Sequence, residues 1–143
     1  MIVIGVLIAL ALPRLAAPVV EARQLRLKML LNATRTTAGL FNLRCTTRDP
    51  GAQPSCDRLA LDGQEVAGVH GWPAASADGI AKALNLSGPT ADIDWQLERI
   101  EGVPALRARL KPIGVVGTCE FIYAQAASPG AVPRIELIDA SCS

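Results

Sequence analysis

Aromatic side chains, histidines and metal-ligand motifs are scarce in this chain of 143 residues. Only 3% of its residues are aromatic, and its one histidine is His70. So few rings leave no stacking platform for nucleic-acid bases or sugars. We therefore expect a core of Leu, Ile, Val and Ala, as in a helix packed on a sheet. The absence of any Cys-x-x-Cys pair argues against a zinc site.

Residues with catalytic potential are separated from one another. The chain has no glycine-rich phosphate loop and no nucleophile elbow. His70 has no nucleophile or base nearby in sequence, so we expect a loop histidine beside Trp72-Pro73. Asp92 and Asp94 would share one face of a strand, but calcium takes roughly six to eight oxygens, so a solvated face is expected. The sequence therefore predicts no enzyme, no metal and no cofactor.

An uncharged apolar run opens the chain. It extends from Met1 to Leu12 and ends at Pro13-Arg14. A membrane-spanning helix needs about 20 apolar residues, so this run is too short to span a bilayer by itself. A secretory signal peptide has basic residues before its apolar part, and none precede this run. Composition alone leaves a cleaved signal peptide and a retained helix equally open.

Charge is distributed unevenly along the chain. Residues 1–48 carry seven basic side chains and one acidic side chain, whereas residues 49–143 carry seven basic and twelve acidic ones. The two parts therefore have formal charges of +6 and −5, which the net charge of +1 conceals. The positive-inside rule would keep the basic segment in the cytoplasm. A basic leader ahead of Met1 would reconcile that rule with the disulfides considered next.

The four cysteines are Cys45, Cys56, Cys119 and Cys142, and they allow three disulfide connectivities. We favour Cys45–Cys56 with Cys119–Cys142, because each pair brackets a segment rich in turn residues. Each closure would stabilise the fold by roughly 3 kcal/mol in the chain-entropy description. The alternative is four free thiols in a cytosolic core.

Residues 14–44 predict one helix. Apolar side chains recur along it at three- and four-residue steps, with Leu30 and Phe41 alongside, and we expect this stripe to pack on a sheet: Ala22, Leu25, Met29, Ala33 and Leu40. Most cations of the helix lie off the stripe: Arg23, Arg26, Lys28 and Arg35.

Short elements and turns fill the rest of the chain. We expect a loop over 45–56, a hairpin over 59–69 that turns at Asp62-Gly63, and a short helix over 74–86 that begins at an N-cap, Ser76. Strands are expected over 93–100, 106–110, 115–125 and 134–138. A helix followed mostly by strands predicts an α+β fold, with a long N-terminal helix packed on a small antiparallel sheet.

The apolar run and the residues after it, Met1-Ile-Val-Ile-Gly-Val-Leu-Ile-Ala-Leu-Ala-Leu-Pro-Arg14, resemble the N-terminal helix of type IV pilins and pseudopilins. Gly5 and Pro13 fall on the glycine and proline of that family without a gap, and Arg14 follows as it does there. The resemblance implies that about nine mature residues and a basic leader precede Met1. The motif with which the chains of that family begin is not found in this sequence. These assembly-helix residues, Gly5, Pro13 and Arg14, are thus expected in a membrane helix before assembly and in a filament core afterwards.

A second stretch narrows the resemblance. Leu61 to Ala75, followed by Gly79-Ile80, is similar to the mannose-sensitive haemagglutinin pilin group, which has a Val-x-Gly-(Tyr or Trp)-Pro-x-Ala segment before a short helix. Thr118 to Gln125 and Pro133 to Cys142 resemble the disulfide-bracketed end of that group. The resemblance covers about half of the chain.

The resemblance implies a structural subunit of a type IV pilus or pilus-like filament that takes part in adhesion. Residues 1–20 would form the membrane and filament-core half of the helix, and residues 21–143 the globular head. The expected partners are other pilin subunits and the inner membrane before assembly, without nucleic acid, and the head would be periplasmic or extracellular. A type II secretion pseudopilin and a secreted, disulfide-bonded binding module behind a signal peptide are the alternatives.

Overall fold

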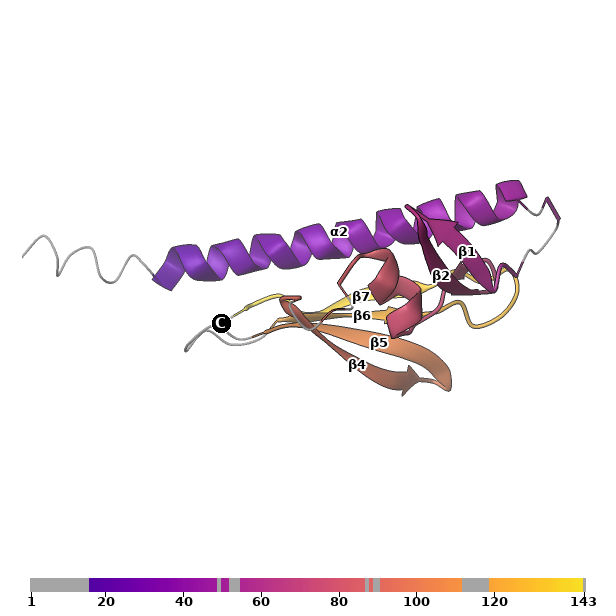
Figure 1. Ribbon diagram of the computed structural model, residues 1–143. Helices are drawn as coiled ribbons and strands as arrows, with labels where there is room; N and C mark the ends of the chain where they lie inside the picture. Colours follow the sequence, from indigo (N-terminus) through magenta and orange to yellow (C-terminus); the bar gives the residue numbers. More distant parts are fainter. Residues whose placement is uncertain are drawn as a thin grey trace, which may run out of the picture.

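The computed structural model describes residues 16–48, 50–51, 55–86, 88, 91–111 and 119–142, with side chains of the helix described from Val19 onward. A long helix, α2 (Ala16–Arg48), comes first and is followed in these residues by seven strands and a short η2 helix. The strands form two antiparallel sheets that lie along the same helix (Figure 1). The chain therefore has the α+β architecture that its sequence predicts.

The face of α2 that contacts the sheets is not the face that the sequence indicates. Its buried side chains are Arg23, Leu27, Leu30, Leu31, Thr34, Ala38, Phe41 and Cys45. Apart from its neighbours Leu30 and Phe41, the predicted stripe is exposed throughout, at Ala22, Leu25, Met29, Ala33 and Leu40. The prediction was wrong because two apolar stripes run along α2, and periodicity does not say which one a sheet will cover. Thr34 is a polar residue within the buried stripe and interrupts its apolar pattern in the sequence. Its hydroxyl is satisfied there because it donates to the Leu30 carbonyl at 2.7 Å.

The helix also continues past its predicted end at residue 44. Cys45, the first residue beyond that end, is fully buried in the core, whereas the rest of the added turn is exposed. The hydroxyls of Thr46 and Thr47 donate to the Leu43 carbonyl at 2.9 and 2.8 Å. Threonine is disfavoured in helix interiors, partly because its hydroxyl can bond backbone groups in place of the helical hydrogen bonds. Here the hydroxyls bond the helix itself, and the helix reaches Arg48.

The smaller sheet lies beside the C-terminal part of α2. Strands β1 (Arg58–Leu61) and β2 (Gln64–Val69) form the predicted hairpin, and its turn residues Asp62 and Gly63 have φ of 50° and 78°. A third strand, β3 (Trp72–Pro73), pairs with β2. That strand was not predicted, because two residues are too few to show a period.

Close contact between β2 and α2 depends on one glycine. A Cβ atom at Gly68 would overlap the Cys56 carbonyl oxygen and the Phe41 ring. The backbone of β2 can therefore lie directly on the buried aromatic ring of the helix.

A short helix, η2 (Ala77–Ala81), replaces the longer helix predicted over 74–86. Ser76 is its N-cap as expected, and the Ser76 side chain accepts from the Gly79 backbone N–H at 3.0 Å. The chain is non-helical at Gly79, with φ −93° and ψ −115°, which prevents a regular α-helix from continuing. The next residue, Ile80, is completely buried and attaches the segment to the core.

The larger sheet has the strand order β4-β5-β6-β7, all antiparallel, with bounds Ile93–Ile100, Val103–Leu110, Glu120–Ala124 and Arg134–Asp139. The first and last strands agree with the predicted ranges to within one residue, and β5 begins three residues earlier than predicted. The predicted strand over 115–125 is described only from residue 119, and β6 forms its described part.

The inner face of this sheet packs on α2. Leu27 and Leu30 of the helix contact a cluster that includes Leu110 and Phe121. Beside them, the Trp95 ring meets the Phe121 ring edge to face at 6.4 Å. Burial of these side chains supplies the main stabilising term of the head, at about 1.5–3 kcal/mol for each large apolar side chain.

Two disulfides tie the ends of these elements together. Cys45–Cys56 joins the last turns of α2 to the segment before β1, and Cys119–Cys142 joins the start of β6 to the end of the chain. Both pairs are the ones that the turn-rich segments predict. All four cysteines are buried, so the two bridges are parts of the core.

Candidate assembly surface

Exposed apolar side chains recur along the solvent side of α2, with the exposed Thr36 between Ala33 and Leu40. We call this row of side chains the exposed stripe and define it by seven residues at three- and four-residue steps or their multiples: Val19, Ala22, Leu25, Met29, Ala33, Leu40 and Leu43. The exposed fractions of Leu25, Met29 and Leu43 are 61%, 64% and 62%. At 1.5 Å per residue the stripe is roughly 36 Å long. Single exposed apolar residues are ordinary, whereas a row of them along one helix face is a candidate interaction surface.

Polar contacts hold α2 against the head and so keep the exposed stripe facing outward. The Arg26 guanidinium forms a two-bonded ion pair with the Asp92 carboxylate, at 2.9 and 3.0 Å. On the other side of the helix, the Gln24 amide donates to the Ser141 carbonyl at 3.1 Å. Because contacts on both sides resist rotation of the helix about its axis, the stripe cannot turn inward without breaking them.

The ion pair also changes the acidity of its carboxyl group. The hydrogen bonds from Arg26 lower the pKa of Asp92, an effect that partial burial opposes. Asp92 lies before β4 and faces the helix, so the two carboxylates do not share one strand face as the sequence predicts, although both residues are exposed. Asp94 lies within β4 and is exposed.

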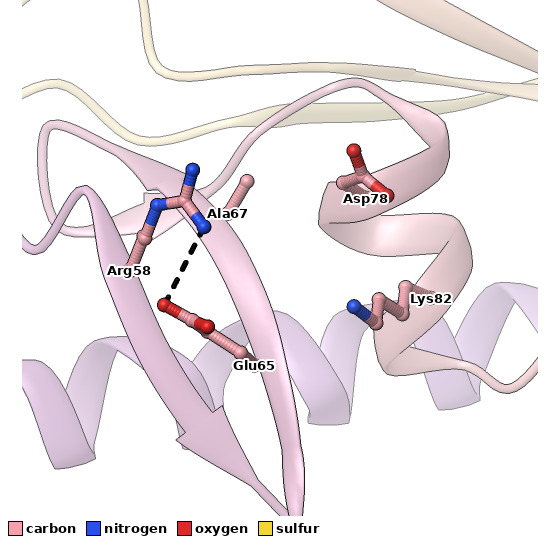
Figure 2. A pocket seen from close by; sticks show the side chains of 5 residues that line it. All are labelled: Arg58, Glu65, Ala67, Asp78 and Lys82. Atoms are coloured by element: carbon pink, nitrogen blue, oxygen red, sulfur yellow. Dashed lines mark ion pairs between the residues drawn. The ribbon is translucent and has the colours of Figure 1, made fainter.

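A charged cleft lies between the hairpin and η2 (Figure 2). Its volume is about 160 Å³, and it is lined by Arg58, Glu65, Ala67, Asp78 and Lys82. One pair on its hairpin side, Arg58 of β1 and Glu65 of β2, is 3.5 Å apart, and both side chains are more than half exposed. Such pairs contribute about 0–1 kcal/mol, because water screens them. The cleft has charges of both signs, and its side chains Arg58, Glu65 and Asp78 are exposed.

The ionic groups on the outer face of the larger sheet bind one another. The Arg107 guanidinium bridges Glu98 at 2.9 Å and Glu120 at 2.7 Å, and Glu120 also accepts from Arg109 at 3.1 Å. Hydrogen bonding to Glu98 raises the pKa of Arg107. These groups are satisfied by one another, which is typical of a structural network rather than a reactive centre.

Several predicted site residues can be placed and others cannot. His70 lies in the turn between β2 and β3, with φ 51°. Across the described ranges, no three His, Cys, Asp or Glu side chains are grouped as metal ligands. The assembly-helix residues Gly5, Pro13 and Arg14 lie outside the described residues. No helix within residues 16–48 or the later described ranges is long and apolar enough to cross a membrane.

Sequence reasoning found five of the seven residues of the exposed stripe, all except Val19 and Leu43, but assigned them to the core. Their period was visible, and the signal that could have placed them was a second stripe with better core residues, including Phe41 and Cys45. A comparison of the chain with protein-family models, with curated proteins and with solved structures gives no match.

Proposed function

We propose that this chain is a structural subunit of a type IV pilus or pilus-like filament, without catalysis of its own. The observation that carries the proposal is the exposed stripe of α2, an apolar surface opposite the face that packs on the head. A monomer would leave this surface in water at a cost proportional to its area. Packing against helices of other copies would remove it from water.

The chain before the helix supports the same proposal. The apolar run from Met1 to Leu12 is followed, after Pro13-Arg14, by the start of α2 at Ala16. The resemblance of this run to pilin N-terminal helices implies insertion in the inner membrane before assembly, with the head in the periplasm or outside the cell. A secretion pseudopilin would use the same surface. The alternative of a secreted binding module would place its ligand in a pocket such as the solvent-screened charged cleft.

The proposal is tested by making the exposed stripe polar. In the full chain, Leu25→Ser, Met29→Ser and Leu40→Ser are combined, detergent is removed from the purified protein, and filaments are measured by sedimentation and electron microscopy. We expect the wild type to form filaments and the triple variant to remain unassembled. Circular dichroism and thermal unfolding should show an intact head, because all three side chains are at least half exposed.

A matched control uses Leu97→Ser, which changes a leucine of β4 that is 72% exposed and lies away from the helix. This variant should assemble like the wild type. A triple variant that assembles normally, or a wild type that stays monomeric after detergent removal, contradicts the proposed function.

A further inference from the structure

Two cations without a partner border the exposed stripe on one side. Lys28 and Arg35 are exposed, and neither makes a hydrogen bond or ion pair within the part of the chain that the structure describes. On a helix with about 3.6 residues per turn, they lie roughly 100° and 120° around the axis from Met29, which is in the middle of the stripe. Both residues therefore lie beside the apolar face, at about the level of the helix axis.

Cations border the stripe on its other side as well. Arg26 and Arg44 lie roughly 60° around the axis from the middle of the stripe, in the opposite direction. Both are bonded to the head, Arg26 to Asp92 and Arg44 to the Ala60 carbonyl. The sequence of α2 has six basic residues and one acidic residue, Glu21. An apolar helix face with cations on both sides is typical of helices that lie in the interface of an anionic bilayer.

The distribution of charge gives the helix and the head opposite preferences for such a surface. Residues 1–48 have a formal charge of +6, and residues 49–143 have a formal charge of −5. The larger sheet packs on the buried face of α2 (Figure 1), so the exposed stripe points away from it. An anionic surface attracts the helix and repels the head, and the chain therefore approaches it with the exposed stripe first.

The chain ahead of α2 limits how far the helix can begin from lipid. The apolar run ends at Leu12 and α2 begins at Ala16, four residues later, which is at most roughly 14 Å of chain. With the run in a bilayer, α2 begins close to the bilayer surface. An upright α2 would hold Leu40 roughly 36 Å above its own first residue, whereas a helix lying flat brings Leu40 to the lipid.

We propose that, before assembly, α2 lies along the surface of an anionic phospholipid bilayer, with the exposed stripe in the interface and Lys28 and Arg35 bound to lipid headgroups. The inference rests on the membrane stage of the proposed function and not on filament formation. It gives the exposed stripe an earlier partner than other copies of the chain. Lipid and neighbouring subunits then compete for the same surface, and α2 must leave the bilayer before it can pack in a filament.

Quenching of a tryptophan by brominated lipid tests this orientation. Leu40→Trp is made in the full chain, which is reconstituted at low protein content in vesicles of phosphatidylglycerol and phosphatidylcholine brominated on its acyl chains. Wild-type chain, whose Trp72 and Trp95 lie in the head, gives the background emission. We expect the emission added by Leu40→Trp to fall at least about twofold, because interfacial helices are buried by roughly 5–10 Å. Leu97→Trp, at a position on β4 that is 72% exposed, should add emission that is not quenched.

Removal of the two unpaired cations tests the part played by charge. Combined with Leu40→Trp, the changes Lys28→Gln and Arg35→Gln should shift the equilibrium from docked to undocked helix by roughly tenfold or more, which weakens the quenching. A matched control combines Arg99→Gln with Arg134→Gln, on strands β4 and β7 of the larger sheet, and should leave the quenching unchanged. Vesicles of brominated phosphatidylcholine alone should quench much less than those with phosphatidylglycerol.

Lack of quenching at every protein-to-lipid ratio would mean that the exposed stripe stays in water or is covered by other copies, and it overturns the docking. Quenching that is equal with and without anionic lipid, or equal in the two pairs of charge variants, also overturns it. If the wild type forms filaments but Leu40→Trp is not quenched, the docking fails and the proposed function stands. Quenching in a chain that forms no filaments supports the docking and overturns the filament subunit.

Discussion

The two faces of α2 are almost equally apolar, but one is buried against the head and the other is exposed. One face carries Leu27, Leu30 and Phe41, which are at most 3% exposed against the head. The other carries Leu25, Met29 and Leu43, which are more than 60% exposed. Adjacent residues along the same helix therefore differ completely in what they contribute to the folded monomer.

This difference in burial between the two faces shows that an apolar stripe in a sequence predicts a packing surface but does not indicate what packs on it. The buried face was selected because it carries Phe41, which packs beneath β2, and Cys45, which is bonded to Cys56. The exposed face has no such partner within the chain's described residues. Under the proposed function, the exposed face is the part of α2 whose stability depends on other copies of the chain.

The largest effect is expected from truncating the buried face at Phe41. Phe41→Ala should destabilise the head by about 3–5 kcal/mol, because it removes a fully buried ring and leaves a cavity. The neighbouring change Leu40→Ala should cost no more than about 0.5 kcal/mol, because Leu40 is half exposed. Both are measured by urea unfolding of the full chain in the same detergent.

The same pair of variants separates folding from assembly. Leu40→Ala should reduce filament formation while leaving the unfolding midpoint almost unchanged. Equal loss of stability in the two variants would mean that the helix packs through both faces in the monomer, and the distinction between the faces would be wrong.

A smaller effect is expected at two glycines: Gly68 of β2, which packs on the buried face of α2, and Gly39, which lies on the exposed side of α2. Gly68→Ala should cost about 1–3 kcal/mol, because its methyl group would overlap the Cys56 carbonyl oxygen and the Phe41 ring. Gly39 lies within α2, and a methyl group there would meet no atom within 4 Å. Gly39→Ala should therefore stabilise the head by about 0.5–1 kcal/mol. Thermal unfolding of both variants gives the comparison, and a tolerated Gly68→Ala would argue against close β2–α2 packing.

Local sequence signals predicted most of the helices and strands. The features that they did not predict, such as which face of α2 is buried, depend on long-range contacts. Asp62-Gly63 fixed the hairpin turn, and the alternation from Ile93 onward fixed β4, because both depend on neighbours in sequence. The buried side of α2 depends on contacts with strands more than 50 residues away, such as Leu27 with Phe121.

The candidate assembly surface was also predictable only where it depends on local sequence. The sequence identifies most residues of the exposed stripe and the excess of cations on the helix. It does not show that Lys28 and Arg35 lack partners while Arg26 is paired, since that depends on where Asp92 lies in the fold. Pairing across 66 residues leaves no periodic trace in the chain.

The smallest predicted effect concerns the ion pair that fixes the orientation of the two faces. The Arg26 hydrogen bonds lower the pKa of Asp92 below its ordinary value of 3.8. A group whose pKa is lower in the folded state stabilises the fold above its unfolded pKa, and this stability is lost as the pH falls through the folded pKa. Both side chains are 40–50% exposed, so we expect Asp92→Asn to cost no more than about 0.5 kcal/mol at pH 7. In urea unfolding that difference should shrink as the pH falls below about 3.8. An Asp92→Asn difference that persists unchanged at the lowest pH would show that the Asp92 charge has no part in holding the helix.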